Sequence, residues 1–237
     1  MIRLYVTETL STGHPLSLPE SQSHYLTKVM RLGVGDEVLL FNGRDGEWKA
    51  HIQEIQKKSA VLHLTTQTRS QTSEGDLWLL FSPLKPKRQE FLVEKATELG
   101  ATCLWPMRCQ HTSSPLKEDK MKAHAIEAAE QSKRLTVPFI KPLTSLTTLL
   151  QEWPQDRVLL FGDETLTAPP LHSLSLDPHQ PYGFLVGPEG GFSPQELDLL
   201  RTHAQGVTLS PHILRTETAA LVGLTGIAML QESFPKT

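Results

Sequence analysis

Three short segments of the sequence combine residue types that could bind an anion or assist a proton transfer. The first is the loop Gly187-Pro188-Glu189-Gly190-Gly191, between an apolar run at 184–186 and a helix start at Ser193. Because glycine has no Cβ, the backbone of such a loop can approach a ligand closely, and the following helix N-terminus favours anionic or polar groups. The spacing matches neither GxGxxG nor a Walker A loop, so it predicts no dinucleotide or ATP site. A plain strand-to-helix turn is the alternative.

The second segment, residues 209–219, also leaves a short apolar run and enters a helix, which is rich in small residues. Arg215 and Glu217 stand at that helix start, where Thr216 could act as the cap. Arg215 could stabilise negative charge, and Glu217 or Glu189 could accept a proton. A capped helix with a surface Arg–Glu pair is the alternative reading.

The third segment carries Lys85, Lys87 and Arg88 directly after an apolar strand. Such a cationic cluster is typical of phosphate contacts, although solvated loop charge gives the same pattern. The residues that could extend it into a phosphate-binding track are Lys28, Arg31, Lys133 and Arg134. No histidine spacing typical of catalytic metal sites accompanies these segments, so we expect no metal.

The order of predicted elements indicates two domains, 1–72 and 73–237. Short strands at 37–41, 47–52 and 60–64, with a helix over 24–32, predict a small N-terminal β-barrel. A polar stretch at 65–76 then separates it from alternating strands and helices. Apolar strands at 77–81, 103–105, 158–161, 184–186 and 207–209 alternate with helices at 88–99, 117–135, 193 onward and 216–231. Such alternation predicts an α/β domain with a parallel sheet, whose ligands gather at the carboxyl ends of the strands.

Composition excludes several classes of protein. The 237 residues are 38% hydrophobic and 21% charged, as in globular proteins, and no apolar run reaches the ~18–20 residues that span a membrane. The N-terminus lacks the form of a signal peptide, and Cys103 and Cys109 provide no disulfide framework, so we expect a cytoplasmic protein. The net charge of −3 conceals a basic middle and an acidic C-terminal part, which leaves a polyanionic partner open.

Taken together, the segments resemble a known family. GPEGGF at 187–192 and ILRTETA at 213–219 resemble the last two motifs of the RsmE family, SPOUT-class methyltransferases that modify N3 of a uridine in 16S ribosomal RNA. The stretches 24–43, 84–101 and 127–138 resemble its PUA-like N-terminal barrel and its mid-chain motifs, so the likeness covers nearly the whole chain.

The resemblance implies S-adenosylmethionine as cofactor, a C-terminal trefoil knot, a homodimer and the small ribosomal subunit as substrate. It assigns the cofactor to residues of the two loops and the helix start: Val186, Gly187, Pro188, Glu189, Gly190, Gly191, Leu209, Ser210, Ile213, Leu214, Arg215, Thr218 and Ala219. The catalytic candidates are Arg215, Glu217 and Glu189, and the lysines and arginines named above would bind RNA.

Two positions depart from the family, which commonly has arginine where this chain has His111 and His212. These replacements put individual cationic contacts to cofactor or RNA in doubt. Two other functions stay open: a SPOUT methyltransferase that modifies another base or a ribose, and a noncatalytic ribosomal RNA-binding or assembly factor.

Overall fold

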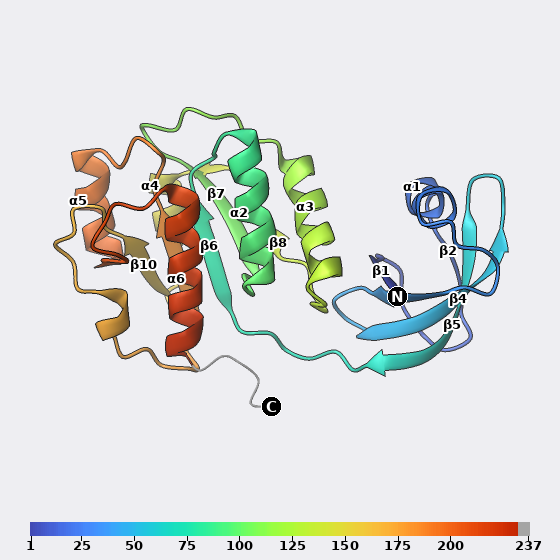
Figure 1. Ribbon diagram of the computed structural model, residues 1–237. Helices are drawn as coiled ribbons and strands as arrows, with labels where there is room; N and C mark the ends of the chain where they lie inside the picture. The colour runs from blue at the N-terminus through green and yellow to red at the C-terminus, as the bar shows by residue number, and fades with distance from the viewer. Residues whose placement is uncertain (232–237) are drawn as a thin grey trace. The chain divides into compact units, whose positions relative to one another are not determined.

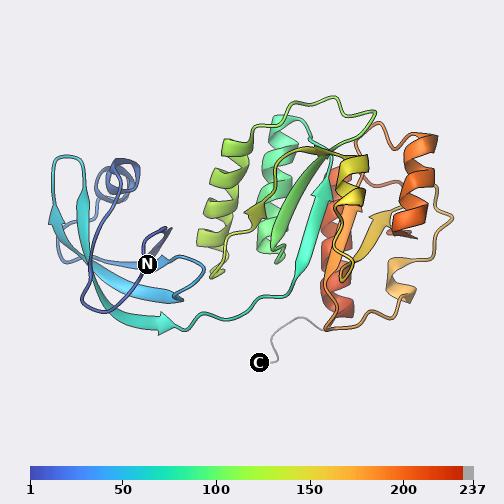
Figure 2. The same cartoon turned by 180° about the vertical axis from the view of Figure 1, so that it is seen from behind.

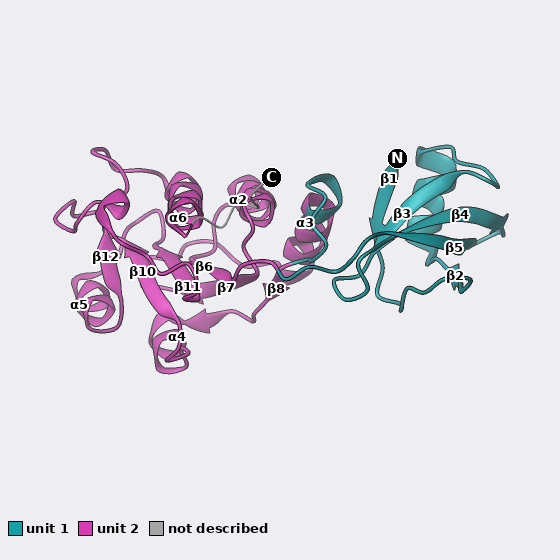
Figure 3. Ribbon diagram, turned by 90° about the horizontal axis from the view of Figure 1, so that it is seen from below, with its two compact units in different colours: residues 1–73, 129–137 teal, residues 74–128, 138–237 magenta. Residues whose placement is uncertain are grey.

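The computed structural model describes residues 1–231 and contains two compact units, coloured teal and magenta in Figure 3. The first consists of Met1–Ser73 with Ala129–Val137, and the second of Glu74–Ala128 with the chain from Pro138 onward. The sequence placed one boundary near residue 72. It gave no sign that a nine-residue segment from the middle of the chain belongs with the N-terminal unit.

The N-terminal unit contains a five-stranded sheet in the order β1-β3-β4-β5-β2. Its elements are β1 (Ile2–Tyr5), β2 (Pro15–Ser17), α1 (Glu20–His24), a π-helix (Tyr25–Val29), β3 (Glu37–Phe41), β4 (Glu47–Ile55) and β5 (Ala60–Arg69). β1 and β3 are parallel, and the other pairs are antiparallel. Alternate side chains such as Leu40, Ala50 and Leu62 are fully buried in its core, because successive residues of a strand face opposite sides.

The predicted helix over 24–32 is wrong in its position. The helical residues begin at Glu20, directly after Pro19, and end at Val29. Arg31 adopts a left-handed backbone conformation with φ of 58°, which stops the helix before Leu32.

A buried arginine attaches the segment 129–137 to this unit. Arg3 Nε donates to Glu47 Oε2 at 2.6 Å, and Arg3 Nη1 donates to the Ala129 carbonyl at 2.7 Å. Its other terminal nitrogen donates to the Arg134 carbonyl, and its guanidinium lies 3.7 Å from the centre of the Phe41 ring. Every donor group of this guanidinium thus has a partner, as a buried charge requires.

The second unit is built on a parallel sheet in the order β12-β10-β11-β6-β7-β8, with β9 paired to β7. The strands are β6 (Leu77–Phe81), β7 (Cys103–Arg108), β8 (Phe139–Ile140), β9 (Thr144–Ser145), β10 (Val158–Gly162), β11 (Tyr182–Val186) and β12 (Gln205–Val207). Every pair is parallel, which confirms the predicted class of sheet. Helices cover both faces, so the central strands consist of apolar residues almost throughout.

The helices are α2 (Pro86–Glu98), α3 (Glu118–Gln131), α4 (Leu146–Gln151), α5 (Pro194–His203) and α6 (Thr216–Leu230), with a 3₁₀ turn at Leu171–Ser173. In Figure 3, α2 and α6 lie on one face of the sheet and α4 and α5 on the other. Figure 1 is drawn from the α2 and α6 side, and Figure 2 brings the yellow α4 to the front. On the first face, α6 contacts α2, β11 and β6.

Two predicted helix ends are confirmed in detail. Ser193 accepts a hydrogen bond from the Glu196 amide, and the Glu196 side chain accepts one from the Ser193 amide, which completes a capping box. Gly100 follows α2 with φ of 91°, a conformation that glycine adopts without strain. The segment 117–135 differs, because its helix ends at Gln131 and the chain turns with φ of 61° at Lys133.

Candidate functional site

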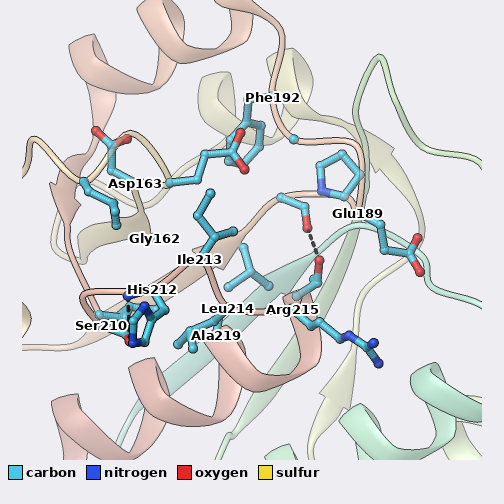
Figure 4. Close-up of a pocket in the computed structure, with 18 of the residues that line it drawn as sticks. Gly162, Asp163, Glu189, Phe192, Ser210, His212, Ile213, Leu214, Arg215 and Ala219 are labelled. Carbon is cyan, nitrogen blue, oxygen red and sulfur yellow. Dashed lines mark hydrogen bonds between the residues drawn. The ribbon is translucent and has the colours of Figure 1, made fainter.

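A pocket of about 360 Å³ lies at the carboxyl ends of the neighbouring strands β10, β11 and β12. Ligands gather at this edge of parallel sheets, so its position agrees with the expectation from the sequence. The lining residues are Arg88, Gly162, Asp163, Glu164, Leu166, Val186, Gly187, Pro188, Glu189, Gly191, Phe192, Val207, Leu209, Ser210, His212, Ile213, Leu214, Arg215, Thr216 and Ala219. Figure 4 shows the two loops that form most of the wall.

The glycine loop is held in a tight turn. The Gly191 amide donates to the Pro188 carbonyl at 2.9 Å, and Gly191 has φ of 72°. At Gly187, a Cβ would come within 2.8 Å of the Phe192 ring, so the ring can pack on the loop only because the residue is glycine. The turn is therefore a specific structure and not a loose connection.

One hydrogen bond joins the two predicted segments. The Thr216 hydroxyl donates to the Gly187 carbonyl at 3.1 Å, drawn as a dashed line in Figure 4. The predicted cap is wrong here, because Arg215 occupies the N-cap position without a side-chain cap and Thr216 begins the helix. Thr216 instead fixes the start of α6 to the glycine loop.

The pocket presents free backbone donors beside apolar side chains. Within residues 1–231, the amides of Leu209, Ile213 and Leu214 have no acceptor on the protein. Val186 and Leu209 add apolar wall to the same space. Amides next to apolar surface can hold a planar heteroaromatic group, because its polar edge receives hydrogen bonds while its faces pack against carbon.

Acidic side chains surround the pocket. Asp163 is almost fully buried and accepts hydrogen bonds from the Thr165 amide and hydroxyl at 2.9 and 2.7 Å. Arg201 Nη2 lies 3.7 Å from Asp163 Oδ2. Asp163 and Glu164 directly follow β10, and Glu189 belongs to the glycine loop. Negative charge at this edge favours a ligand that carries positive charge.

Arg88 contacts two of the three predicted catalytic residues. Its Nη1 lies 3.1 Å from Glu189 Oε1, and its Nε lies 3.7 Å from Glu217 Oε1. Glu217 is buried in the first turn of α6, and its Oε2 has no hydrogen-bond partner among residues 1–231. The side chain of Arg215 is exposed and forms no ion pair in the same part of the chain. In Figure 4, Glu189 and Arg215 lie on one side of the pocket, opposite Asp163 and Ser210.

Most of the predicted cofactor residues line the pocket, and only Gly190 and Thr218 do not. Four lining residues were not predicted from the sequence: Gly162, the last residue of β10, and Asp163, Glu164 and Leu166, which follow this strand. One signal could have found them: they follow a continuous apolar strand, and the carboxyl ends of parallel strands meet at one edge.

The predicted RNA-binding cations have different environments. Lys28, Arg31, Lys85, Lys87 and Lys133 are exposed. Arg88 differs, because it is ion-paired to two glutamates, and the structure therefore gives this guanidinium a partner other than RNA. Arg134 is buried, and its guanidinium donates to the Thr136 hydroxyl at 3.1 Å. Arg134 is therefore less accessible than the other predicted RNA-binding cations, and its phosphate contact stays a prediction.

The histidines at the two unusual positions both lie near the loops. His111 Nδ1 lies 3.0 Å from the Gly191 carbonyl oxygen, so this side chain contacts the glycine loop. His212 lines the pocket, and its amide donates to the Ser210 hydroxyl at 3.1 Å. Neither imidazole forms an ion pair with a carboxylate among residues 1–231.

The described residues contain no group of three or more metal-ligating side chains that could hold a metal ion. No helix within the same part of the chain is long and apolar enough to cross a membrane. Both cysteines are buried as free thiols, and burial raises the pKa of each to about 12, so neither provides a reactive thiolate near neutral pH.

Comparison with known families defines the class of protein first. The model of an RNA methyltransferase domain matches residues 71–228, and that of an RNA methyltransferase PUA domain matches residues 18–65. The first match spans the pocket and every element of the parallel sheet. The fold and the pocket therefore define an RNA methyltransferase domain, preceded by a PUA domain.

Individual relatives narrow the class. The chain is 30% identical over 236 residues to the ribosomal RNA small subunit methyltransferase E of Rickettsia conorii, covering 96% of this chain and 95% of that one. It belongs to the ribosomal RNA small subunit methyltransferase E family.

Two solved structures share both units. The ribosomal RNA small subunit methyltransferase E of Neisseria gonorrhoeae, bound to S-adenosylmethionine, has a TM-score of 0.89 at 29% identity and covers 97% of this chain and 98% of that one. A methyltransferase-class protein from Legionella pneumophila, also with bound S-adenosylmethionine, has a TM-score of 0.86 at 26% identity, with 96% and 97% covered. The predicted fold class, an α/β domain with a parallel sheet and a PUA-like N-terminal domain, is confirmed. The knot stays a prediction.

Proposed function

We propose that the chain transfers a methyl group from S-adenosylmethionine to N3 of a uridine in the 16S RNA of the small ribosomal subunit. The observation that carries the proposal is the pocket itself, whose free amides and acidic rim lie inside the region matched by the RNA methyltransferase model. Relatives with that name, or with that cofactor bound, support the choice of reaction and donor.

The residues of the pocket fit this cofactor. The amides of Leu209, Ile213 and Leu214 suit the polar edge of an adenine ring, and Val186 supplies apolar contact. The acidic residues suit a sulfonium cation. The full set proposed to hold it is the set assigned by sequence, with Gly190 and Thr218 contributing through the loop and helix that carry them.

When bound, S-adenosylmethionine would supply an electrophilic methyl group to the acceptor nitrogen. The chain has to align the acceptor with this methyl, and such positioning supplies much of the rate. N3 of uracil carries a proton at neutral pH, and its loss leaves negative charge on the ring oxygens. We assign Arg215 to that charge and Glu217 or Glu189 to the proton.

The target uridine has to be unpaired, because N3 lies on the edge used in base pairing. Lys28, Arg31, Lys85, Lys87 and Lys133 are exposed cations that can neutralise phosphates around it. We extend the proposal to a cytoplasmic location, because a small ribosomal subunit is a substrate of that compartment.

We extend the proposal to a homodimer. Ile213, Val222 and Met229 expose 72%, 37% and 61% of their surface, and all three belong to α6 or the loop before it. Exposed apolar side chains on one element support an interface with a second copy. Light scattering coupled to size exclusion is the direct measurement, and a monomer at micromolar concentration would remove this part of the proposal.

The decisive experiment maps the product. Purified small subunits that lack the modification are incubated with the protein and methyl-labelled S-adenosylmethionine, and the RNA is digested to nucleosides for mass spectrometry. N3-methyluridine is the expected product. A methylated ribose or another base would indicate a different RNA methyltransferase. No product together with no cofactor binding by calorimetry would indicate a noncatalytic RNA-binding factor.

A further inference from the structure

We propose that Arg88 is a positioning residue, which links Glu189 in the pocket wall to the buried Glu217 at the start of α6 and does not serve as an RNA phosphate contact. The catalytic role of Arg88 rests on the proposed methyl transfer, whereas its contacts with the two glutamates do not depend on that function. Arg88 belongs to the cationic segment 85–88, from which the sequence alone predicts RNA binding.

The contacts join three separate elements. Arg88 lies in the first turn of α2, Glu189 in the glycine loop after β11, and Glu217 in the first turn of α6. The guanidinium uses two different nitrogens, Nη1 toward Glu189 at 3.1 Å and Nε toward Glu217 at 3.7 Å. A planar guanidinium can hold two carboxylates in a fixed relation, whereas an ammonium group acts as a single point charge.

Burial and charge separate Arg88 from its neighbours. Its side chain is 35% exposed, whereas Lys85 and Lys87, which precede it in the chain, are exposed. Two negative partners offset its positive charge, so an incoming phosphate would have to displace a carboxylate. Arg88 also lines the pocket, which neither lysine does.

The arrangement distinguishes the two carboxylates. Glu189 Oε1 receives a hydrogen bond from Arg88, and its side chain is 27% exposed. Glu217 is 11% exposed and is held only through Oε1, which leaves Oε2 buried without a partner among residues 1–231. Glu217 does not line the pocket, so its buried carboxylate anchors Arg88 to the start of α6, whereas Glu189 is the carboxylate that lies in the pocket wall. Arg88 thus acts through Glu189, which it keeps in place together with the glycine loop.

The test uses the full chain with Arg88→Gln, Arg88→Lys and two matched controls. Lys87→Gln removes the exposed cation next to Arg88, and it is the control for the loss of an RNA contact. Lys95→Gln removes another α2 cation that contacts two glutamates, Glu94 and Glu98, but lies outside the pocket lining. Arg88→Gln is also combined with Glu217→Gln and, separately, with Glu189→Gln.

Three readouts are measured: kcat and KM for methyl transfer to small subunits, the salt dependence of RNA binding, and urea unfolding. We expect Arg88→Gln to lower kcat about 10- to 100-fold, as small misplacements in a site do, with KM for RNA little changed. Arg88→Lys should recover part of that loss. The logarithmic salt slope should fall by about one for Lys87→Gln and stay constant for Arg88→Gln.

The changes in the free energy of unfolding caused by Arg88→Gln and Glu217→Gln should be non-additive, because the two side chains are in contact. The changes caused by Lys95→Gln and Glu217→Gln should be additive. Unchanged kcat in Arg88→Gln, or a salt slope reduced as in Lys87→Gln, would overturn the proposal. Additive unfolding effects would overturn it as well, even if wild-type protein methylates no RNA. A wild type without methyl transfer but with coupled unfolding effects would contradict the proposed function alone and leave the Arg88 contacts supported.

Discussion

Arg215 differs from Arg88 in having no carboxylate partner within residues 1–231, so its guanidinium is free to meet a substrate. We expect Arg215→Ala to lower kcat about 100-fold, in the range found when a donor to a developing negative charge is removed. Arg215 also lines the pocket and belongs to the set proposed to hold the cofactor. We assign that contact to its backbone, which alanine keeps, so S-adenosylmethionine affinity measured by calorimetry should change less than about threefold. Full activity would remove Arg215 from the mechanism, and loss of cofactor binding alone would make it a ligand contact.

Lys133 carries backbone strain that a substitution can relieve. It is exposed and has φ of 61°, a conformation that costs a residue with a Cβ roughly 1–2 kcal/mol. Part of the gain is lost because glycine is more flexible when unfolded, so we expect Lys133→Gly to raise the free energy of unfolding by about 0.5–1 kcal/mol. Urea unfolding measures it. Lys133→Ala is the control, and an equal gain from alanine would show that backbone conformation is not the cause.

At the scale of elements, the contact between α6 and β11 depends on Gly223. A Cβ there would come within 2.0 Å of the Phe184 ring, which is fully buried in the sheet. Alanine favours helix by about 1 kcal/mol over glycine, but overpacking a rigid core costs more. We expect Gly223→Ala to lower the free energy of unfolding by about 1–3 kcal/mol.

Thermal or urea unfolding gives the result for Gly223→Ala, with Thr225→Ala as a control at a partly exposed position of the same helix. Stabilisation by Gly223→Ala would mean that helix preference outweighs packing and that α6 can move away from Phe184.

The sequence predicts those elements whose ends depend on local chemistry. The Ser193 capping box, Gly100 after α2 and the apolar strands β6, β7, β10 and β11 are decided within a few residues, and each is confirmed. The strand predicted at 207–209 is misplaced, because β12 covers Gln205–Val207. The position of the first helix was wrong, because Arg31 ends it through a backbone conformation that residue type does not indicate. The glycine loop could be located by its glycines and by the Ser193 cap that follows it, whereas the cap predicted after the second loop was wrong.

Partners distant in sequence were beyond such reasoning. In the sequence, Arg88 cannot be distinguished from the lysines before it. Its two partners, Glu189 and Glu217, belong to other elements that lie close to it only in the fold. The burial of Arg134 likewise results from the return of 129–137 to the N-terminal unit. Asp163 was missed because a lone acid after a strand has no meaning until the strand order is known.

At the scale of the whole molecule, the two buried thiols report on unfolding of the second unit. Since thiolates react and burial raises both thiol pKa values to about 12, the native protein should react slowly with Ellman's reagent at pH 8. Urea should release both Cys103 and Cys109 together. Rapid reaction of either thiol in native protein would contradict the burial.

The raised pKa values of the two thiols also make the stability of the protein depend on pH. Each thiol has a folded-state pKa above its ordinary value of 9.0, so its contribution is intact below pH 9 and is lost as the pH rises toward 12. We expect the urea midpoint to fall between pH 9 and 10.5, and to fall less in the Cys103→Ala, Cys109→Ala double variant. An equal fall in both proteins would assign the effect to other groups.

The segment 129–137 has a consequence for any attempt to divide the protein. A fragment that ended at Ser73 would lack the Ala129 and Arg134 carbonyls, and Arg3 would keep a buried charge with two donors unmatched. The N-terminal unit is thus not an exchangeable module that a single cut can transplant between enzymes. A functional chimera would have to inherit both stretches from the same parent, and recombination within 74–128 would separate them.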